Sequence, residues 1–238
     1  MNKDSAKDLA QSVNEFYETH GAAFGRTRGF VWAEEKLVAE RIQPGMTVLD
    51  VGAGNGRFAR LLPAGVTYIG FEPSSTLRES SNLPLCHSRE GGNLAPTDIT
   101  IHDLRDGSLP HLPIPDATAD VTVCFAVFHH LTQNERKASV EELLRITKSG
   151  GLIAASAWIV PMKKTEPVEG GEQNDRWMHW RAEGAEAKRY VHLFDAAEWN
   201  ALWTRSDIII EKIGMFGKED WTDDLQTARN WFVLARKA

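Results

Sequence analysis

Short apolar runs alternate with segments of helical periodicity along most of the chain from residue 31 onward. Five apolar, β-branched runs have the length of buried strands: 47–51, 67–72, 98–103, 121–127 and 151–159. Helical spacing of apolar residues appears between and before them, over 31–42 and over 134–149, where Gly150 and Gly151 are expected to end the helix. This alternation predicts βαβ units around a mainly parallel sheet.

Two further apolar runs lie near the C-terminus, at 206–217 and 230–237, and predict a closing hairpin or antiparallel edge. With them, the expected fold is α/β: a doubly wound, seven-stranded, mainly parallel, Rossmann-like sheet with helices on both faces. The whole chain, 1–238, is expected to form one domain. Residues from about 8 to 42 are expected to form an N-terminal helical cap on it.

Residues 82–97, NLPLCHSREGGNLAPT, interrupt the alternation with a polar segment that has neither a helical nor a strand period. Only residues 74–82 before it have the character of a crossover helix. The string CHSREGGN resembles the translation of dispersed DNA repeats found inside some bacterial genes, which implies a surface insertion. Cys86 and His87 acting as a redox or metal-binding pair is the chemical alternative.

Residues 160–190 form a second interruption, which is long for a connection and rich in aromatic and charged residues. Long ordered connections in compact domains are usually functional, so this segment is expected to be a lid over a substrate. Trp177 and Trp180 could equally serve to pin the segment to the core.

Composition narrows the class of protein. A net charge of -6 argues mildly against a surface built to hold polyanions. The two cysteines, Cys86 and Cys124, are far apart and lack ligand spacing, so no disulfide framework and no metal site are expected. No stretch has the length and hydrophobicity of a signal peptide or a membrane span, so we expect a cytoplasmic protein without membrane attachment.

The segment VLDVGAGNGRF places Gly52, Gly54 and Gly56 directly after the first predicted strand. Glycines there allow a sharp turn and a close approach of a ligand to the backbone. Dinucleotide-binding loops have the pattern G-x-G-x-x-G, whereas Arg57 stands here where the third glycine belongs. The glycine turn therefore favours a ligand other than a dinucleotide.

Carboxylates follow the strands around this turn. Asp50 ends the first strand, and Glu72 ends the second, where its two oxygens could accept hydrogen bonds from a ribose diol. Asp103 ends the third predicted strand, where it could accept a hydrogen bond from an adenine amino group. Asp106 is the alternative residue for this role. The carboxyl ends of neighbouring strands meet at the crevice of a doubly wound sheet, so these residues are expected to share one site.

Four segments together resemble the successive motifs of class I S-adenosylmethionine-dependent methyltransferases: VLDVGAGNGRFARLL, YIGFEPS, DATADVTVCFAVFHHLT and RITKSGGLIAASAW. The resemblance covers about residues 46–160 and implies S-adenosylmethionine as cofactor. It also implies the residues that would bind it, namely Asp50, Gly52, Ala53, Gly54, Asn55, Gly56, Glu72, Asp103, Ala126 and Val127.

Shorter segments at both ends are similar to tRNA wobble-uridine methyltransferases, which esterify a carboxymethyl group: FYETHGAAFGRTRGFVW, FAVFHHLT, KRYVHLF and NWFVLARK. This resemblance implies tRNA as the methyl acceptor and a small activator protein as a partner. Val191 departs from it, since those enzymes tend to have tyrosine there. The segment 160–190 also has six basic and six acidic residues, which supplies no net charge for binding phosphates.

A carboxylate acceptor is already a nucleophile at neutral pH, so catalysis would rest on alignment and on excluding water, aided by cationic groups. The candidate catalytic residues are Arg26, His129 and His192, and the candidate substrate-binding residues are Arg28, Arg189 and Tyr190. One histidine of the pair His129–His130 could instead be buried and hydrogen-bonded.

Two other functions remain open at this point. The first is O- or N-methylation of a small molecule beneath a lid formed by 160–190 and the N-terminal helix. The second is a non-catalytic, cofactor-binding subunit that regulates a partner. An NAD-dependent oxidoreductase is disfavoured by the glycine spacing and by the two histidines after the fourth strand.

Overall fold

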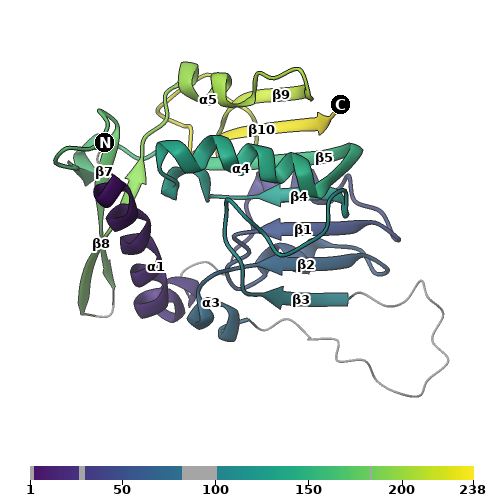
Figure 1. Cartoon of the computed structure of the whole chain (residues 1–238), viewed down its shortest axis with the longest axis horizontal. Helices are drawn as coiled ribbons and strands as arrows, with labels where there is room; N and C mark the ends of the chain where they lie inside the picture. The colour runs from purple at the N-terminus through teal and green to yellow at the C-terminus, as the bar shows by residue number, and fades with distance from the viewer. Residues whose placement is uncertain (1–2, 27–29, 82–100, 183) are drawn as a thin grey trace.

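The computed structural model describes residues 3–26, 30–81, 101–182 and 184–238, and its main sheet has seven strands in the order β3-β2-β1-β4-β5-β10-β9 (Figure 1). The strands are β1 (Thr47–Val51), β2 (Thr67–Phe71), β3 (Ile101–Arg105), β4 (Ala119–Cys124), β5 (Thr147–Trp158), β9 (Ile208–Phe216) and β10 (Asn230–Lys237). β1 to β5 pair in parallel, and β10 pairs antiparallel with β5 and with β9. The predicted doubly wound sheet and its antiparallel edge are confirmed.

Helices cover both faces of this sheet, and each face has its own apolar core. On one face, α4 (Gln133–Ile146) and α5 (Ala196–Trp203) bury side chains such as Leu143 and Trp203 against β1, β4 and β5. On the other face, α2 (Ala33–Ala39) and the 3-10 helix η1 (Arg57–Leu61) bury Val38 and Phe58. Period-2 alternation along the strands supplies both faces with apolar side chains.

The segment 160–190, expected as a lid loop, instead forms a second sheet. A short 3-10 helix, η4 (Met162–Lys164), leads into the antiparallel strands β6 (Thr165–Pro167), β7 (Asp175–Ala182) and β8 (Ala185–His192). The chain then returns to the main domain at Phe194, whose backbone oxygen accepts a hydrogen bond of 2.9 Å from Nε1 of Trp231. Backbone pairing between β7 and β8 explains how so long a connection can be ordered.

The helix α1 (Lys3–Arg26) lies at the end of the sheet to which the parallel strands point, beside β7, β8 and the short helix α3 (Ser75–Glu79) (Figure 1). It is attached to the start of α3, because the Glu18 carboxylate accepts a hydrogen bond of 2.9 Å from the backbone N–H of Ser75 and another from its hydroxyl. The expected helical cap therefore comprises two helices, α1 and α2, placed on different sides of the crevice.

Other boundaries shift by a few residues. The predicted helix 31–42 is shorter, at Ala33–Ala39, and the predicted strand 98–103 becomes Ile101–Arg105. α4 ends at Ile146, and Gly150 and Gly151 lie within β5, next to an irregularity in its pairing with β4, where they do not end a helix. The proposed insertion 82–97, with Cys86 and His87, lies outside the described residues.

Candidate functional site

The glycine turn after β1 forms the floor of the site. Gly52, Gly54 and Gly56 all have positive φ angles, of 76°, 58° and 73°, which side chains rarely tolerate. A Cβ atom at Gly52 would lie 2.2 Å from Cγ2 of Val127, whereas a Cβ atom at Gly54 would meet nothing within 4 Å. Gly52 thus allows the turn to approach the segment after β4, and Gly54 faces open space.

Glu72 follows β2 and lies across the turn from Gly54. Its side chain is buried, Oε2 accepts from the backbone N–H of Gly54 at 3.0 Å, and Oε1 accepts from that of Ser74 at 2.9 Å. Burial raises the pKa of Glu72 to about 7, although both backbone N–H groups favour the ionised form. A carboxylate therefore stands at the strand end where the sequence places a partner for a ribose diol.

Asp50, at the end of β1, is also buried and accepts a hydrogen bond of 2.8 Å from the Tyr68 hydroxyl. Burial raises the pKa of Asp50 to about 7 as well. Both carboxyl groups line a cavity of about 570 Å³ at the carboxyl ends of β1, β2 and β4, which also takes in Ala53, Asn55, Ala126 and Val127. This volume is in the range of small-molecule and cofactor sites.

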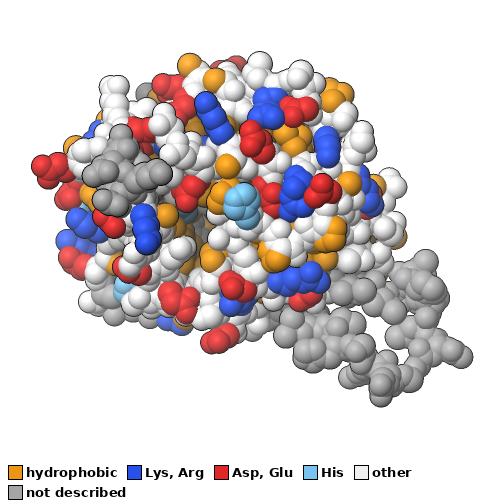
Figure 2. Space-filling model, viewed as in Figure 1, with side chains coloured by type: hydrophobic (Ala, Val, Ile, Leu, Met, Phe, Trp, Pro, Cys, Tyr) orange, Lys and Arg blue, Asp and Glu red, His pale blue; other side chains and the backbone are white. Residues whose placement is uncertain are grey.

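The cavity is closed on one side by α1, and Figure 2 shows this face of the molecule hollowed, with hydrophobic side chains in the depression. Tyr17 and Phe24 of α1 line the cavity, as do Trp158 and His130. An acidic and partly apolar cavity with a glycine floor fits S-adenosylmethionine, whose sulfonium is positive and whose adenosine presents a diol. The open space at Gly54 lets such a ligand approach the backbone.

His130, rather than the predicted His129, lines the cavity. Its Nδ1 lies 2.9 Å from the backbone oxygen of Tyr190 and its Nε2 lies 2.9 Å from the Tyr17 hydroxyl. Because a carbonyl oxygen only accepts, Nδ1 carries the hydrogen and Nε2 accepts from Tyr17. Burial, together with the positive charge of Arg189, lowers the pKa of His130 to about 3, so the ring is neutral.

Arg189 lies behind these side chains, is 1% exposed and is not among the described residues that line the cavity. Its guanidinium carbon is 4.2 Å from the ring centroid of Phe16, 5.2 Å from that of Phe24 and 5.3 Å from that of Trp158. Within the described part of the chain, Nε and Nη1 have no hydrogen-bond partner and no carboxylate pairs with this arginine. Burial lowers the pKa of Arg189, and a hydrogen bond with the Tyr17 hydroxyl offsets this only in part.

The structure places the other predicted catalytic residues away from the cavity. His129 stacks on Trp158, with ring centroids 4.3 Å apart, and its Nδ1 accepts from the backbone N–H of Trp158 at 3.2 Å. Arg26 is exposed at the end of α1. Neither is among the described residues that line the cavity, and Arg28 lies outside the described residues.

His192 is held in a buried ionic network. Its Nδ1 lies 2.8 Å from the Asp175 carboxylate and its Nε2 lies 2.8 Å from that of Glu198. Arg136 of α4 donates to Glu198 at 2.8 Å and to Glu172 at 3.2 Å. His192 therefore joins β8 to α4 and α5, and it does not touch the cavity.

Glu172, Asp175 and His192 offer ligand atoms within 4.8 Å of one another, which is close enough for a metal ion. However, both ring nitrogens of His192 already have carboxylate partners, and Arg136 supplies positive charge at this cluster. We therefore interpret the cluster as a structural ionic network. Tyr190 belongs to it, since its hydroxyl donates to Asp175 at 2.7 Å, and it is not among the described residues that line the cavity.

Asp103 lies inside β3, two residues before the strand ends at Arg105, and is paired with that arginine at 2.7 Å. It is not among the described residues that line the cavity, whereas Gly107, Ser108 and Leu109 are. The rival Asp106 immediately follows the strand and lies 3.3 Å from Arg78. The expectation that Asp103 ends this strand is wrong, because the strand begins and ends later than the apolar run indicates, and the role of Asp103 at the adenine stays a prediction.

Several lining residues are not among those predicted from the sequence, including Tyr17, Trp32, Glu35 and Arg57. Arg57 is visible in the sequence only as the residue that breaks the dinucleotide pattern. Tyr17, Trp32 and Glu35 lie in the helical N-terminal segment, where nothing in their spacing distinguishes them from packing or solvated residues. No helix within the described residues is long and apolar enough to cross a membrane.

Comparisons with known proteins agree with this geometry. A family model described as a methyltransferase domain matches residues 49–155, which run from β1 into β5. The tRNA (carboxymethyluridine(34)-5-O)-methyltransferase of Schizosaccharomyces pombe is 26% identical over 248 residues, covering 94% of this chain and 96% of that protein. The Arabidopsis thaliana protein of the same name is 29% identical over 154 residues, covering 64% of this chain and only 34% of that protein.

Among solved structures, the complex between the Haloferax volcanii Trm112 methyltransferase activator and its candidate methyltransferase is similar, with a TM-score of 0.61 and 16% identity. The match covers 93% of this chain and 97% of the matched chain, and it shows a shared fold. The domain match and the relatives make this chain an S-adenosylmethionine-dependent methyltransferase, and its sheet has the Rossmann-like fold of the class I enzymes. Within this class it resembles the tRNA carboxymethyluridine methyltransferases.

The pKa of Glu72 predicts a pH dependence for ligand binding. 5′-Methylthioadenosine has the ribose diol of the cofactor but no amino-acid group that titrates near neutral pH. If ionised Glu72 accepts from the diol, the affinity for this ligand should fall about fivefold to tenfold from pH 8 to pH 6, as the carboxylate protonates. Calorimetry at both pH values measures this, and the Glu72→Gln variant should show a flat profile. An equal slope in that variant would assign the dependence to another group.

Proposed function

We propose that this methyltransferase transfers a methyl group to a carboxylate, and that the carboxylate is the carboxymethyl group on the wobble uridine of tRNA. The observation that carries the proposal is Arg189. A buried guanidinium with two nitrogens that lack a hydrogen-bond partner and no acidic partner among the described residues is costly unless a ligand supplies negative charge. The relatives named for this reaction in fission yeast and Arabidopsis support the same acceptor.

The chemistry of this acceptor suits the groups at the cavity. A carboxylate oxygen attacks the methyl carbon, the carbon–sulfur bond breaks, and no proton has to be removed. His130 is neutral and already accepts from Tyr17, so its arrangement matches a role in holding that side chain in place. Catalysis then rests on alignment of the carboxylate and on exclusion of water by α1 and the aromatic side chains.

The cofactor would occupy the glycine-floored part of the cavity, next to Asp50 and Glu72, and the acceptor would enter beside Tyr17 and Trp158. We propose that α1 and the sheet of β6, β7 and β8 close over the acceptor as a cap on a single methyltransferase domain. Arg189 cannot belong to a basic surface for tRNA, since it is buried. A small activator protein could supply such a surface, as the Haloferax volcanii complex illustrates for its own methyltransferase.

Labelled methyl transfer to tRNA tests the proposal directly. Bulk tRNA that lacks only the final methyl ester is incubated with the chain and labelled S-adenosylmethionine, and its nucleosides are then separated. Label in the ester of carboxymethyluridine supports the proposal. Label only in small molecules favours a metabolite O- or N-methyltransferase, and normal cofactor binding without transfer to either favours a regulatory subunit or an enzyme that requires its partner.

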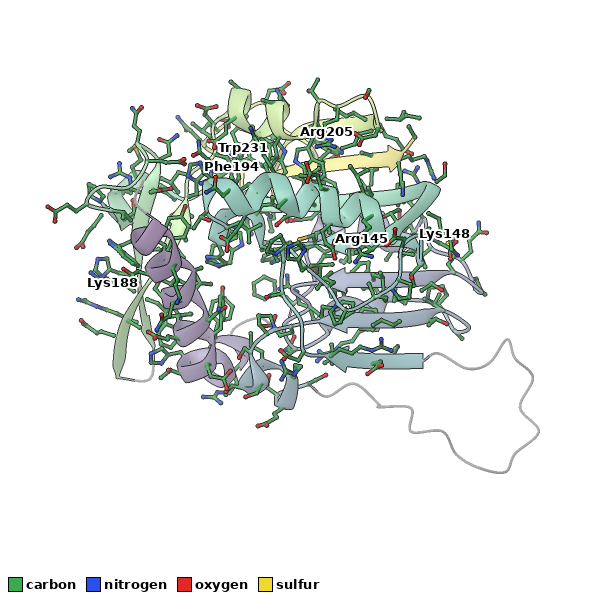
Figure 3. The ribbon with its side chains drawn as sticks, viewed as in Figure 1. Arg145, Lys148, Lys188, Phe194, Arg205 and Trp231 are labelled. Carbon is green, nitrogen blue, oxygen red and sulfur yellow. The ribbon has the colours of Figure 1, made fainter. Side chains whose placement is uncertain are left out.

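Arg189→Met is expected to lower kcat/KM for the tRNA acceptor by about 100-fold, because the acceptor carboxylate loses the buried positive charge behind the cavity wall. Thermal stability should be unchanged or higher, since an apolar side chain of similar length replaces an unpaired buried charge. Lys188→Met is the matched control, because the neighbouring Lys188 is exposed on the outer side of the small sheet, where its Nζ lies 5.0 Å from the ring centroid of Trp177 (Figure 3). Equal losses in the two variants would contradict a specific role for Arg189.

A further inference from the structure

Arg57, the first residue after the glycine turn, is held in a fixed position at the cavity wall. Its Nε and Nη2 donate to one carboxylate oxygen of Glu35, at 2.9 Å and 2.7 Å. Its guanidinium carbon lies 4.1 Å from the ring centroid of Trp32. Glu35 is 1% exposed and also accepts from the backbone N–H of Trp32 at 2.9 Å, so the three side chains form one rigid unit.

This arginine is exceptional among the charges around the cavity. Of the described residues that line it, Arg57 is the only lysine or arginine, and the acidic ones are Glu15, Glu18, Glu35, Asp50, Glu72 and Glu135. Within the described residues, Nη1 of Arg57 has no hydrogen-bond partner, since the ion pair with Glu35 uses Nε and Nη2. A guanidinium has donors for a second carboxylate beyond the one that positions it.

The cofactor brings one negative group and two positive ones. S-adenosylmethionine has a diol and adenine at one end, a positive sulfonium in the middle, and an ammonium and a carboxylate at the other end. The acidic lining suits the sulfonium and the ammonium, and among the described residues that line the cavity only Arg57 attracts the carboxylate.

The arrangement of the strands separates the two ends of the ligand. Glu72 and Gly107 follow β2 and β3, which lie on one side of β1 in the sheet. Phe58, next to Arg57, packs at 5.4 Å on Phe125, which follows β4 on the other side of β1. A ligand whose diol is at Glu72 and whose chain crosses the glycine turn therefore extends its amino-acid end toward Arg57.

We propose that Arg57, held by Glu35 and Trp32, binds the α-carboxylate of S-adenosylmethionine and makes the site selective for cofactors that carry an intact amino-acid end. Arg57 is the binding residue, and Glu35 and Trp32 are positioning residues that fix its orientation. The proposal rests on the cofactor of the class and is independent of the methyl acceptor. It distinguishes S-adenosylhomocysteine, which has the carboxylate, from 5′-methylthioadenosine, which lacks it.

Calorimetry with these two ligands tests the proposal. Arg57→Ala should weaken binding of S-adenosylhomocysteine about tenfold or more, the usual effect of losing one charge-assisted hydrogen bond, and leave binding of 5′-methylthioadenosine within about twofold of its original value. Retained binding of the second ligand also shows that the variant folds. Arg60→Ala is the matched control: it removes an exposed arginine from the same short helix and should change neither affinity.

Because Arg57→Ala leaves the Glu35 carboxylate buried without its cation, the double variant Arg57→Gln, Glu35→Gln gives a second reading. It removes both charges and should show the same selective loss of S-adenosylhomocysteine binding. Equal weakening of both ligands, or unchanged binding of both, in the variants that fold would overturn the proposal. A failed methyl-transfer assay with tRNA would leave these affinities unaffected, so the two proposals are tested separately.

Discussion

Glu72→Ala is expected to weaken S-adenosylmethionine binding about 100-fold or more and to reduce methyl transfer at limiting cofactor by the same factor. The sequence assigns this carboxylate to the ribose diol, and two charge-assisted hydrogen bonds of about 1.5 kcal/mol or more each would be lost. Calorimetry measures the affinity directly. Glu79→Ala is the matched control, since Glu79 is an exposed glutamate at the end of the neighbouring helix α3.

The same variant should not unfold the protein. Since burial raises the folded-state pKa of Glu72 to about 7, any electrostatic contribution of this group to stability is present at acidic pH and lost as pH rises through 7. At pH 8, removing the carboxyl group should therefore leave the melting temperature of the ligand-free protein nearly unchanged. An affinity change below about threefold, in a variant with normal thermal unfolding, would show that Glu72 does not bind the cofactor.

Arg136→Ala is expected to give the largest loss of stability among these variants, about 3–5 kcal/mol, because it removes the cation from a buried group of carboxylates. For a chain of this size, a loss of that order lowers the melting temperature by about 10 °C. Lys137→Ala, at the adjacent exposed position of α4, should change stability by less than about 0.5 kcal/mol. Thermal or urea unfolding separates the two.

The Arg136→Ala deficit should also depend on pH. Burial opposes protonation of His192, but hydrogen bonds to Asp175 and Glu198 outweigh it and raise the pKa of the ring. A group whose folded-state pKa is raised stabilises the protein when protonated, and that stability is lost as pH rises through the folded pKa. The loss should thus be smaller at pH 6, where His192⁺ partly replaces the missing cation, than at pH 8. An equal loss of stability at pH 6 and pH 8 would show that protonated His192 does not compensate for the missing Arg136 cation.

These contacts also connect stability to the site. The network joins β8 to α4 and α5, and Tyr190 within it offers its backbone oxygen to Nδ1 of His130. Phe194 also contacts the network, because the guanidinium carbon of Arg136 lies 5.4 Å from the centroid of its ring. Figure 3 shows Phe194 close to Trp231, beneath α5. Loosening the network should therefore disturb the tautomer and orientation of His130 as well as the fold.

The sequence does not predict which of the two neighbouring histidines, His129 or His130, lines the cavity. Nothing in the pair His129–His130 indicates which ring faces the cavity, because both sit in a short 3-10 turn whose orientation depends on contacts far along the chain. Tyr17 is 113 positions from His130, and Tyr190 is 60 positions from it. Arg189 is a similar case, since its sequence neighbours do not reveal that α1 covers it with aromatic rings.

The sequence by itself determined the part of the fold that is expected to bind the cofactor, namely the strands, the glycine turn after β1 and the carboxylate after β2. Strand periodicity, the alternate glycines 52, 54 and 56 and the carboxylate at Glu72 are local signals, because strand ends and turns restrict the backbone within a few residues. Only the tertiary structure decided which other side chains surround this part of the fold. Tyr17, Glu35 and Arg57 line one cavity, and Arg189 lies buried behind its wall, because α1, α2, η1 and β8 meet there. Their burial and charge pairing depend on packing between distant segments, which no local pattern encodes.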